Sequence, residues 1–293
     1  MTGRSPSRRH TLKTAVGAAA ALTVAAAPPA AASAAEPGAE PGAEPGAEPG
    51  AEPGKAGKAT VVLVHGAFAD ASSWNPVTER LQQYGHRVAA VANPLRGLTH
   101  DAAQVAARLA AVPGPVVLVG HSYGGAVITQ AAATAPNVKA LVYVSAFIPD
   151  AGEVLGELAA RFPGSQLEAS LAPVPVPGPD GTTGVDLYIR PDRYHEVFAQ
   201  DVPRPTTRVL AAGQRPLSGS AFTDRVSSAA WHSLPSWTLV STLDRGIVPE
   251  LQRFQASRAR SRTVKVPSSH LPMYSRPDAV VALIRSAARA VTA

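Results

Sequence analysis

The chain has 293 residues, carries a formal net charge of +6 and contains no cysteine. Disulfide-stabilised folds and thiolate metal sites are therefore excluded, and a folded domain must rest on its hydrophobic core. No dense run of Lys and Arg interleaved with aromatic residues occurs, so the composition also argues against nucleic acid as a partner.

Residues 1–34 have the layout of an export signal. Arg8 and Arg9 precede an Ala-rich apolar segment at about residues 14–27, and small residues suited to a signal peptidase follow. The arginine pair resembles a twin-arginine signal, although Thr11 stands where that pattern often has an aromatic residue. The apolar segment is too short for a membrane span, and no later stretch approaches ~18 continuous apolar residues. We therefore expect a secreted, extracellular protein without stable membrane insertion.

Residues 35–57 form a predicted linker. Five copies of Ala-Glu-Pro-Gly occupy residues 35–54, where Pro prevents helix and sheet hydrogen bonding and Gly removes local stiffness. A repeat this short cannot bury a core, so we expect a disordered, extended tether. Without the four basic residues of the signal and the five Glu of the repeat, residues 55–293 carry +7, a mildly basic charge.

A single domain is expected over residues 58–293, because short β-branched runs alternate there with helical stretches. This alternation is typical of an α/β fold with a mostly parallel, doubly wound sheet and helices on both faces. Each predicted strand is a short, largely apolar run bounded by Gly, Pro or charge. About six strands are expected, at residues 59–66, 87–93, 114–121, 138–146, 236–244 and 262–267.

Three helices are well marked in this pattern. Residues 75–85 open with Asn75 as a cap and Pro76 in the first turn. A second helix is predicted from Thr99 to the residue before Pro113. The last helix, at about 277–291, carries an apolar stripe that should lie against the sheet.

Residues 151–233 do not follow this alternation of short strands and helices. They contain "LAPVPVPGPDGTTG" and several isolated amphipathic pieces between the fourth and fifth predicted strands. Because ligands of open α/β sheets bind at the C-terminal ends of the strands, we interpret this stretch as a cap insertion over that edge. A long surface excursion without function is the alternative.

The sequence "GHSYGG" places Ser122 in a G-x-S-x-G motif. The motif follows the apolar run "VVLV" and precedes "GGAVITQAAATA", which is the strand-to-helix position of a nucleophile elbow. We therefore predict that Ser122 sits in strained backbone geometry with its Oγ exposed above the sheet at a helix N-terminus. A buried helix-capping serine is the alternative.

A serine hydroxyl needs a base to accept its proton and an acid to orient that base. His270 lies in the loop after the last predicted strand, and Asp244 ends the strand before it. The chain order Ser122, Asp244, His270 is the one expected on this type of sheet. Asp150 also follows a predicted strand and remains a rival for the acid, and helix capping remains open for Asp244.

Two backbone N–H groups are required to stabilise the negative oxygen of a tetrahedral intermediate. Tyr123, directly after the candidate nucleophile, supplies one. The turn after the first strand supplies the other, for which we favour Ala67 over its neighbour Phe68. His65 is expected to order this turn by hydrogen bonding, and His121 to point away from the Ser122 Oγ.

With these motifs in place, residues 58–293 resemble the α/β-hydrolase superfamily. "HGAFADASSW" resembles its oxyanion loop, "GHSYGG" its elbow, and "TLDRGIVPELQ" and "SSHLPMYSRPDAVVALI" its acid and histidine segments. The nearest subgroup is the small-ester branch that includes plant methylesterases and hydroxynitrile lyases. The resemblance implies a serine hydrolase with a cap, no metal and no organic cofactor. The cap is proline-rich and not obviously matched, so the substrate is not carried over.

The expected function is therefore hydrolysis of small, uncharged or mildly anionic carboxylic esters through an acyl-enzyme. Four arginines of the insertion are candidates to attract a carboxylate, unless they are only solvated: Arg190, Arg193, Arg204 and Arg215. A lyase or perhydrolase with the same triad is an alternative, although no lysine follows Asp244 as a hydroxynitrile lyase of this branch would require. A ligand-binding protein with negligible turnover is the third possibility, and the oligomeric state is not readable from the sequence.

Overall fold

The computed structural model describes residues 58–178 and 181–292. The predicted export signal and the predicted linker at 35–57 lie outside the described residues. No helix in the described part of the chain has the length and apolar character needed to cross a lipid bilayer.

A six-stranded parallel sheet forms the centre of the domain, in the order β2-β1-β3-β4-β8-β9. All six predicted strands are confirmed, each slightly shorter than predicted. Three central strands are fully buried, as expected of β-branched runs covered on both faces. The strands are β1 (Thr60–Val64), β2 (Val88–Val91), β3 (Val116–His121), β4 (Val138–Val144), β8 (Ser236–Ser241) and β9 (Arg262–Val266).

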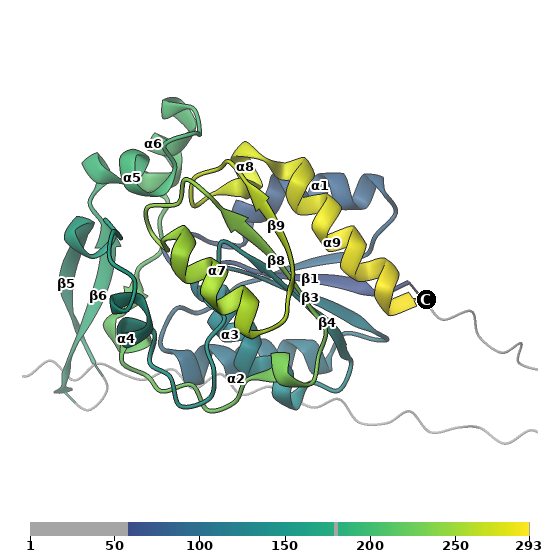
Figure 1. Ribbon diagram of the computed structural model, residues 1–293. Helices are drawn as coiled ribbons and strands as arrows, with labels where there is room; N and C mark the ends of the chain where they lie inside the picture. The colour runs from purple at the N-terminus through teal and green to yellow at the C-terminus, as the bar shows by residue number, and fades with distance from the viewer. Residues whose placement is uncertain (1–57, 179–180, 293) are drawn as a thin grey trace, which may run out of the picture. The chain divides into compact units, whose positions relative to one another are not determined.

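Helices cover both faces of this sheet, which confirms the predicted fold class (Figure 1). One face carries α1 (Asn75–Gln83) and α9 (Pro277–Thr292), which pack against each other. The other carries α2 (Leu98–Ala110), α3 (Tyr123–Ala131) and α7 (Pro249–Arg258). The apolar stripe of α9 is buried, as predicted: Val280, Val281, Leu283, Ile284, Ala287 and Ala288.

Two predicted helix starts need correction. Asn75 is the first residue of α1 and not its cap, because a 3-10 turn at Ala71–Trp74 runs directly into the helix. Asp70 caps that turn, its side chain accepting from the Ser72 N–H. The second helix starts at Leu98, one residue earlier than predicted, after Gly97 in a backbone conformation with φ 124°.

Residues 151–233 form several elements at one end of the sheet (Figure 1). An antiparallel sheet in the order β5-β6-β7 joins three helices. The elements are α4 (Leu155–Ala160), β5 (Leu171–Pro177), β6 (Thr183–Ile189), α5 (Pro191–Phe198), α6 (Arg204–Ala212) and β7 (Leu217–Ser218). The short helix α8 (Pro272–Ser275) follows β9.

The junction of β3 and α3 is packed so closely that only glycine fits. A Cβ on Gly120 would lie 2.5 Å from the Gly124 carbonyl oxygen, and one on Gly124 would lie 2.7 Å from the Val64 carbonyl oxygen. A Cβ on Gly125 would lie 2.4 Å from the Phe147 carbonyl oxygen. Backbone atoms already occupy the space that each added Cβ would need, and backbone cannot move aside as a flexible side chain does.

Gly125→Ala should therefore destabilise the domain, although Ala is the better helix former by up to about 1 kcal/mol. The added methyl has to displace the backbone after β4, and such overpacking costs about 1–3 kcal/mol. Urea unfolding measures the effect. The matched control is Gly213→Ala at the end of α6, where the nearest atom to a Cβ is the Val209 carbonyl oxygen at 3.6 Å. Equal stability of the two variants would contradict this account of the junction.

Candidate active site

Ser122 occupies a strained turn between β3 and α3. Its φ of 54° and ψ of −124° are unusual for a residue with a side chain, as the elbow interpretation predicts. Its side chain makes no helix-capping hydrogen bond. Instead, its Oγ lies 2.7 Å from Nε2 of His270. Gly66 lies against the turn, and a Cβ there would be 2.7 Å from the Ser122 Cβ.

His270 and Asp244 complete a line of hydrogen bonds with Ser122. Nδ1 of His270 lies 2.6 Å from Oδ2 of Asp244. An ionised carboxylate only accepts, so Nδ1 carries the proton and Nε2 presents its lone pair to the serine hydroxyl. All three side chains are buried. The structure thus brings together three residues that stand 122 positions (Ser122 to Asp244) and 26 positions (Asp244 to His270) apart.

The carboxylate of Asp244 is held by its own loop. Oδ1 accepts from the backbone N–H groups of Gly246 and Ile247, at 2.8 and 3.0 Å. Oδ2 accepts from the amide of Gln252 at 2.8 Å, and that amide also donates to the Ile247 carbonyl. Asp244 does not cap α7, whose N-cap is Val248. These bonds fix the carboxylate in the orientation that His270 requires.

Asp150, the rival acid, lies elsewhere. Its Oδ1 accepts from Nε2 of His232 at 2.8 Å and from the Ala151 N–H. Partial burial acts to raise the pKa of Asp150, but the hydrogen bonds from His232 and the Ala151 N–H, together with nearby positive charge, outweigh it and lower the pKa. The structure therefore joins Asp244, and not Asp150, to His270.

The two predicted oxyanion donors have free N–H groups. Within the described part of the chain, no protein acceptor bonds the backbone N–H of Ala67 or of Tyr123. Phe68, the neighbour of Ala67, has a φ of 59° and bends the turn sharply after β1. The Tyr123 side chain is tied down separately, its hydroxyl donating to the buried Asp101 carboxylate at 2.8 Å.

His65 orders the turn before Ala67, as predicted. Its Nε2 accepts from the Asn93 N–H at 3.0 Å, so Nδ1 carries the proton and donates to the Gly66 carbonyl at 2.9 Å. The amide of Asn93 returns a hydrogen bond to the His65 carbonyl. Burial lowers the pKa of His65 to about 4, so this imidazole stays neutral near neutral pH.

His121 proves to be more than a side chain that points away from Oγ. Its Nε2 lies 2.8 Å from the backbone carbonyl oxygen of His270 and must donate to it. The centroid of its ring lies 4.8 Å from that of the His270 ring and 6.3 Å from that of the Trp74 ring, to which it is perpendicular. Burial, and then the neighbouring His270, hold the pKa of His121 well below its ordinary value. His121 is thus covalently joined to Ser122 and hydrogen-bonded to His270.

The insertion reaches the candidate site through one aromatic residue. The ring of Phe198, at the end of α5, lies 4.6 Å from the His270 ring. The centroid of the Phe198 ring in turn lies 5.2 Å from that of the Tyr194 ring and 6.0 Å from that of the Phe68 ring. Phe198 therefore packs on the imidazole, which has no solvent-exposed surface, and the other two rings pack on Phe198.

Two polar residues of the insertion hold the loops of the acid and the base. The amide of Gln200 donates to the Leu243 carbonyl at 2.6 Å, next to Asp244. The carboxylate of Asp201 accepts from the Ser269 N–H at 2.9 Å, next to His270. Sequence reasoning missed both, because adjacent polar residues in a loop carry no signal of their partners.

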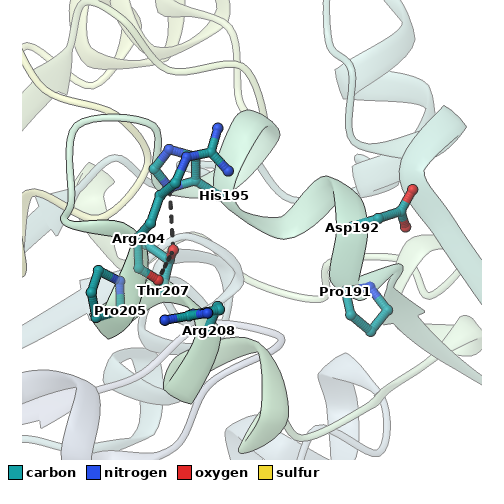
Figure 2. Close-up of a pocket in the computed structure, with 7 residues that line it drawn as sticks. All are labelled: Pro191, Asp192, His195, Arg204, Pro205, Thr207 and Arg208. Carbon is teal, nitrogen blue, oxygen red and sulfur yellow. Dashed lines mark hydrogen bonds between the residues drawn. The ribbon is translucent and has the colours of Figure 1, made fainter.

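A cavity of about 410 Å³ lies between α5 and α6, away from the site just described (Figure 2). Arg204, Arg208, Asp192 and His195 line it, and His195 contacts the Thr207 hydroxyl at 3.2 Å. The Thr207 hydroxyl donates its proton to the Arg204 carbonyl at 3.1 Å, so His195 is not placed to act as a base for it. The other three candidate arginines are engaged: Arg190 with Asp192, Arg193 with Glu196, and Arg215 with the Asn93 carbonyl.

No cluster of side chains suited to a metal ion occurs among the described residues. The geometry of Ser122, His270 and Asp244 suits nucleophilic attack assisted by a general base.

Comparison with known proteins agrees with the motif-based resemblance. A profile of the Alpha/beta hydrolase family matches residues 61–283. The chain is 27% identical over 246 residues to Methylesterase 1 of Arabidopsis thaliana, covering 75% of this chain and 92% of that protein.

Two shorter matches have higher identity. One is 36% identical over 110 residues to the carbendazim hydrolyzing esterase of Nocardioides sp. (strain SG-4G), covering 33% of this chain and 46% of that protein. The other is 34% identical over 107 residues to the Alpha-hydroxynitrile lyase of Arabidopsis thaliana, covering 32% and 42%. The chain thus spans less than half of either protein in these matches.

A solved structure shares the fold. Polyneuridine aldehyde esterase superposes with a TM-score of 0.69 at 20% identity, covering 78% of this chain and 99% of that chain.

The position of His121 leads to a testable prediction. His121→Leu should lower kcat for ester hydrolysis about tenfold or more with little change in KM, because the tie between the elbow and the His270 backbone is lost. His121→Gln keeps an N–H donor and should recover most of kcat. Steady-state kinetics and the rate of fluorophosphonate labelling measure both effects.

The exposed His100 provides the control, since His100→Leu should leave both rates unchanged. A His121→Leu variant that folds and keeps kcat within twofold of the parent would rule out this positioning role. Equal damage from Leu and Gln would show that the N–H donor is not what matters.

Proposed function

Because the chain belongs to the Alpha/beta hydrolase family, we propose that it is an exported serine esterase that uses Ser122, His270 and Asp244. The observation that carries the proposal is the continuous line of hydrogen bonds from Asp244 through His270 to the Ser122 Oγ. Hydrolysis of esters is the activity that the names of several relatives share, and we assign it to this chain.

In the proposed mechanism, the Ser122 Oγ attacks the ester carbonyl carbon while His270 Nε2 takes the hydroxyl proton. The tetrahedral oxyanion receives hydrogen bonds from the free N–H groups of Ala67 and Tyr123, each such donor contributing about 3 kcal/mol. His270 returns the proton to the leaving alcohol. Water then attacks the acyl-enzyme with His270 again as base, which frees the acid and restores Ser122.

Asp244 holds the imidazole in the tautomer that this cycle needs. When His270 becomes an imidazolium, the adjacent carboxylate stabilises its charge in surroundings from which water is excluded. The neutral state of His121 supports this step, because a second positive charge beside the ring would oppose it.

The substrates proposed are small carboxylic esters. Methylesterase 1 and the carbendazim hydrolyzing esterase support ester cleavage, and the enclosed site under Phe198 suits compact molecules. A lyase on the same scaffold is less well supported, because the loop after Asp244 continues with Arg245, Gly246 and Ile247 and contains no lysine.

Ser122→Ala should abolish both labelling by a fluorophosphonate probe and hydrolysis of short p-nitrophenyl esters. Asp244→Asn should lower kcat by about 10⁴-fold, because an amide at this position favours the wrong tautomer of His270. The measurements are initial rates on a panel that includes amides, lactones and a cyanohydrin. Turnover by the Ser122→Ala variant at the parent rate would refute the mechanism.

Asp150→Asn is the matched control for the acid, since Asp150 is bonded to His232. It should retain the parent's kcat. If Asp150→Asn lost activity and Asp244→Asn kept it, the assignment of the acid would be reversed. Cyanohydrin cleavage without ester hydrolysis would favour the lyase.

Export is proposed on the signal-like residues 1–34. Replacing Arg8 and Arg9 by Lys should keep the protein inside the cell if the twin-arginine route is used, because that receptor reads the arginine pair. Fractionation of cells and medium measures this. Unchanged secretion would point to the general export route, and retention of the parent chain in the cell would refute export.

A further inference from the structure

A second cavity, smaller than the one in Figure 2, adjoins the site assigned to catalysis. It measures about 130 Å³ and lies between the turn after β1, the cap helices α5 and α6, and the segment after His270. Its principal lining side chains are Phe68, Asp70, Tyr194, Leu210, Leu271 and Tyr274.

The cavity is next to both the oxyanion donor and the general base of the proposed mechanism. Phe68 directly follows the oxyanion donor Ala67, and Leu271 directly follows His270. Tyr194 packs on Phe198, whose ring covers His270. The lining thus includes the residues next to an oxyanion donor and next to the general base of the proposed mechanism, which makes this space a candidate position for one of the two ends of a bound ester. The cavity in Figure 2 has no such neighbours.

The size and walls of the cavity suit an apolar group. Phe68, Tyr194 and Leu271 are buried, and Leu210 is partly buried. An apolar cavity of about 150 Å³ is known to hold a benzene molecule. A phenyl ring or a short alkyl chain is therefore the group that this space fits.

One carboxylate stands on the wall of the cavity. Hydrogen bonding from Ser72 lowers the pKa of Asp70, so the group is ionised near neutral pH. No Lys, Arg or His side chain is among the described residues that line this cavity. Burial, and then the charge of Asp70, raise the pKa of Tyr274, so the phenol is neutral.

Two titratable or charged groups, Arg215 and His65, lie near Asp70 but outside the lining of the cavity. Arg215 keeps its positive charge and contributes to the lowered pKa of Asp70, but it does not line the cavity, and its guanidinium donates to the Asn93 carbonyl at 3.4 Å. His65 is buried and neutral. The ionised group that faces the cavity is Asp70.

We propose that this cavity is a subsite for the uncharged, apolar end of the ester, and that Asp70 makes the enzyme discriminate against esters that carry a carboxylate at that end. The inference rests on the proposed function and narrows its substrate class from uncharged or mildly anionic esters to uncharged ones. Asp70 is a specificity-determining residue in this scheme and takes no part in bond making.

Two matched pairs of esters test the proposal. p-Nitrophenyl butyrate and mono-p-nitrophenyl succinate differ in a carboxylate on the acyl end. Phenyl butyrate and p-carboxyphenyl butyrate differ in a carboxylate on the alcohol end. For the end that enters the cavity, kcat/KM of the charged ester should be about tenfold lower, mainly through KM, because two negative charges meet where water is partly excluded.

Asp70→Asn keeps the oxygen that caps the Ser72 N–H and removes the charge. This variant should raise kcat/KM for the disfavoured charged ester about fivefold. It should leave kcat/KM for the neutral ester within twofold of the parent's value. Discrimination is measured as the ratio of kcat/KM for the neutral ester to that for the charged ester. About 0.5 M NaCl should reduce this ratio for the parent enzyme and leave it unchanged for the variant. Asp192→Asn, in the cavity of Figure 2, is the control and should leave both ratios unchanged.

The proposal is overturned if Asp70→Asn leaves the discrimination unchanged at both ends of the ester, or if Asp192→Asn changes it equally. Calorimetric binding of the same esters to Ser122→Ala separates this result from failure of the proposed function. If the parent chain hydrolysed none of the esters, the proposed function would fail. The subsite would then still be supported if Ser122→Ala bound the charged ester more weakly than the neutral one and the double variant with Asp70→Asn lost this difference. Equal binding of the two esters to Ser122→Ala would refute the subsite.

Discussion

The backbone of Ser122 is the constraint on which the arrangement of the site depends. A positive φ at a residue with a side chain costs of the order of 1–3 kcal/mol and persists only where the surroundings hold it. Here, Gly66, Gly120 and Gly124 let backbone approach the turn more closely than any side chain would permit. The strain projects Oγ toward His270 instead of into a capping bond, and it places the Tyr123 N–H at the start of α3.

Electrostatics around this turn are arranged so that one histidine can become positive and two cannot. His65 and His121 are buried and neutral, and each uses its single N–H to fix backbone: His65 at the turn after β1, and His121 at His270 itself. Of these three histidines, only His270 is hydrogen-bonded to a carboxylate, and that carboxylate is held by Gln252 and two backbone N–H groups. In the proposed mechanism, the Ser122 proton therefore passes to His270 and to neither of the other two histidines.

The insertion holds the loops of the site and, in the subsite proposal, also forms part of the wall that selects the substrate. Gln200 and Asp201 hold the loops of the acid and the base, while Phe198 covers the imidazole and Tyr194 continues that wall toward the small cavity. The insertion therefore acts on the geometry of the three central residues as well as on access to them. Arg204 and Arg208 line the cavity between α5 and α6 together with Asp192 and do not line the small cavity, so the arginines in this part of the sequence do not describe the charge of that small cavity.

The sequence by itself determined the scaffold and singled out Ser122 and His270 as candidate central residues. Periodicity located all six strands of the sheet, and the G-x-S-x-G motif between an apolar strand and a small-residue helix located Ser122, because both signals are local. The choice between Asp244 and Asp150 was not local: each follows a strand, and only packing shows which one meets His270. The same holds for His121, Gln252 and Asp201, whose partners lie 149, 8 and 68 positions away. Their roles arise from distances across the folded chain, which tertiary structure alone decides.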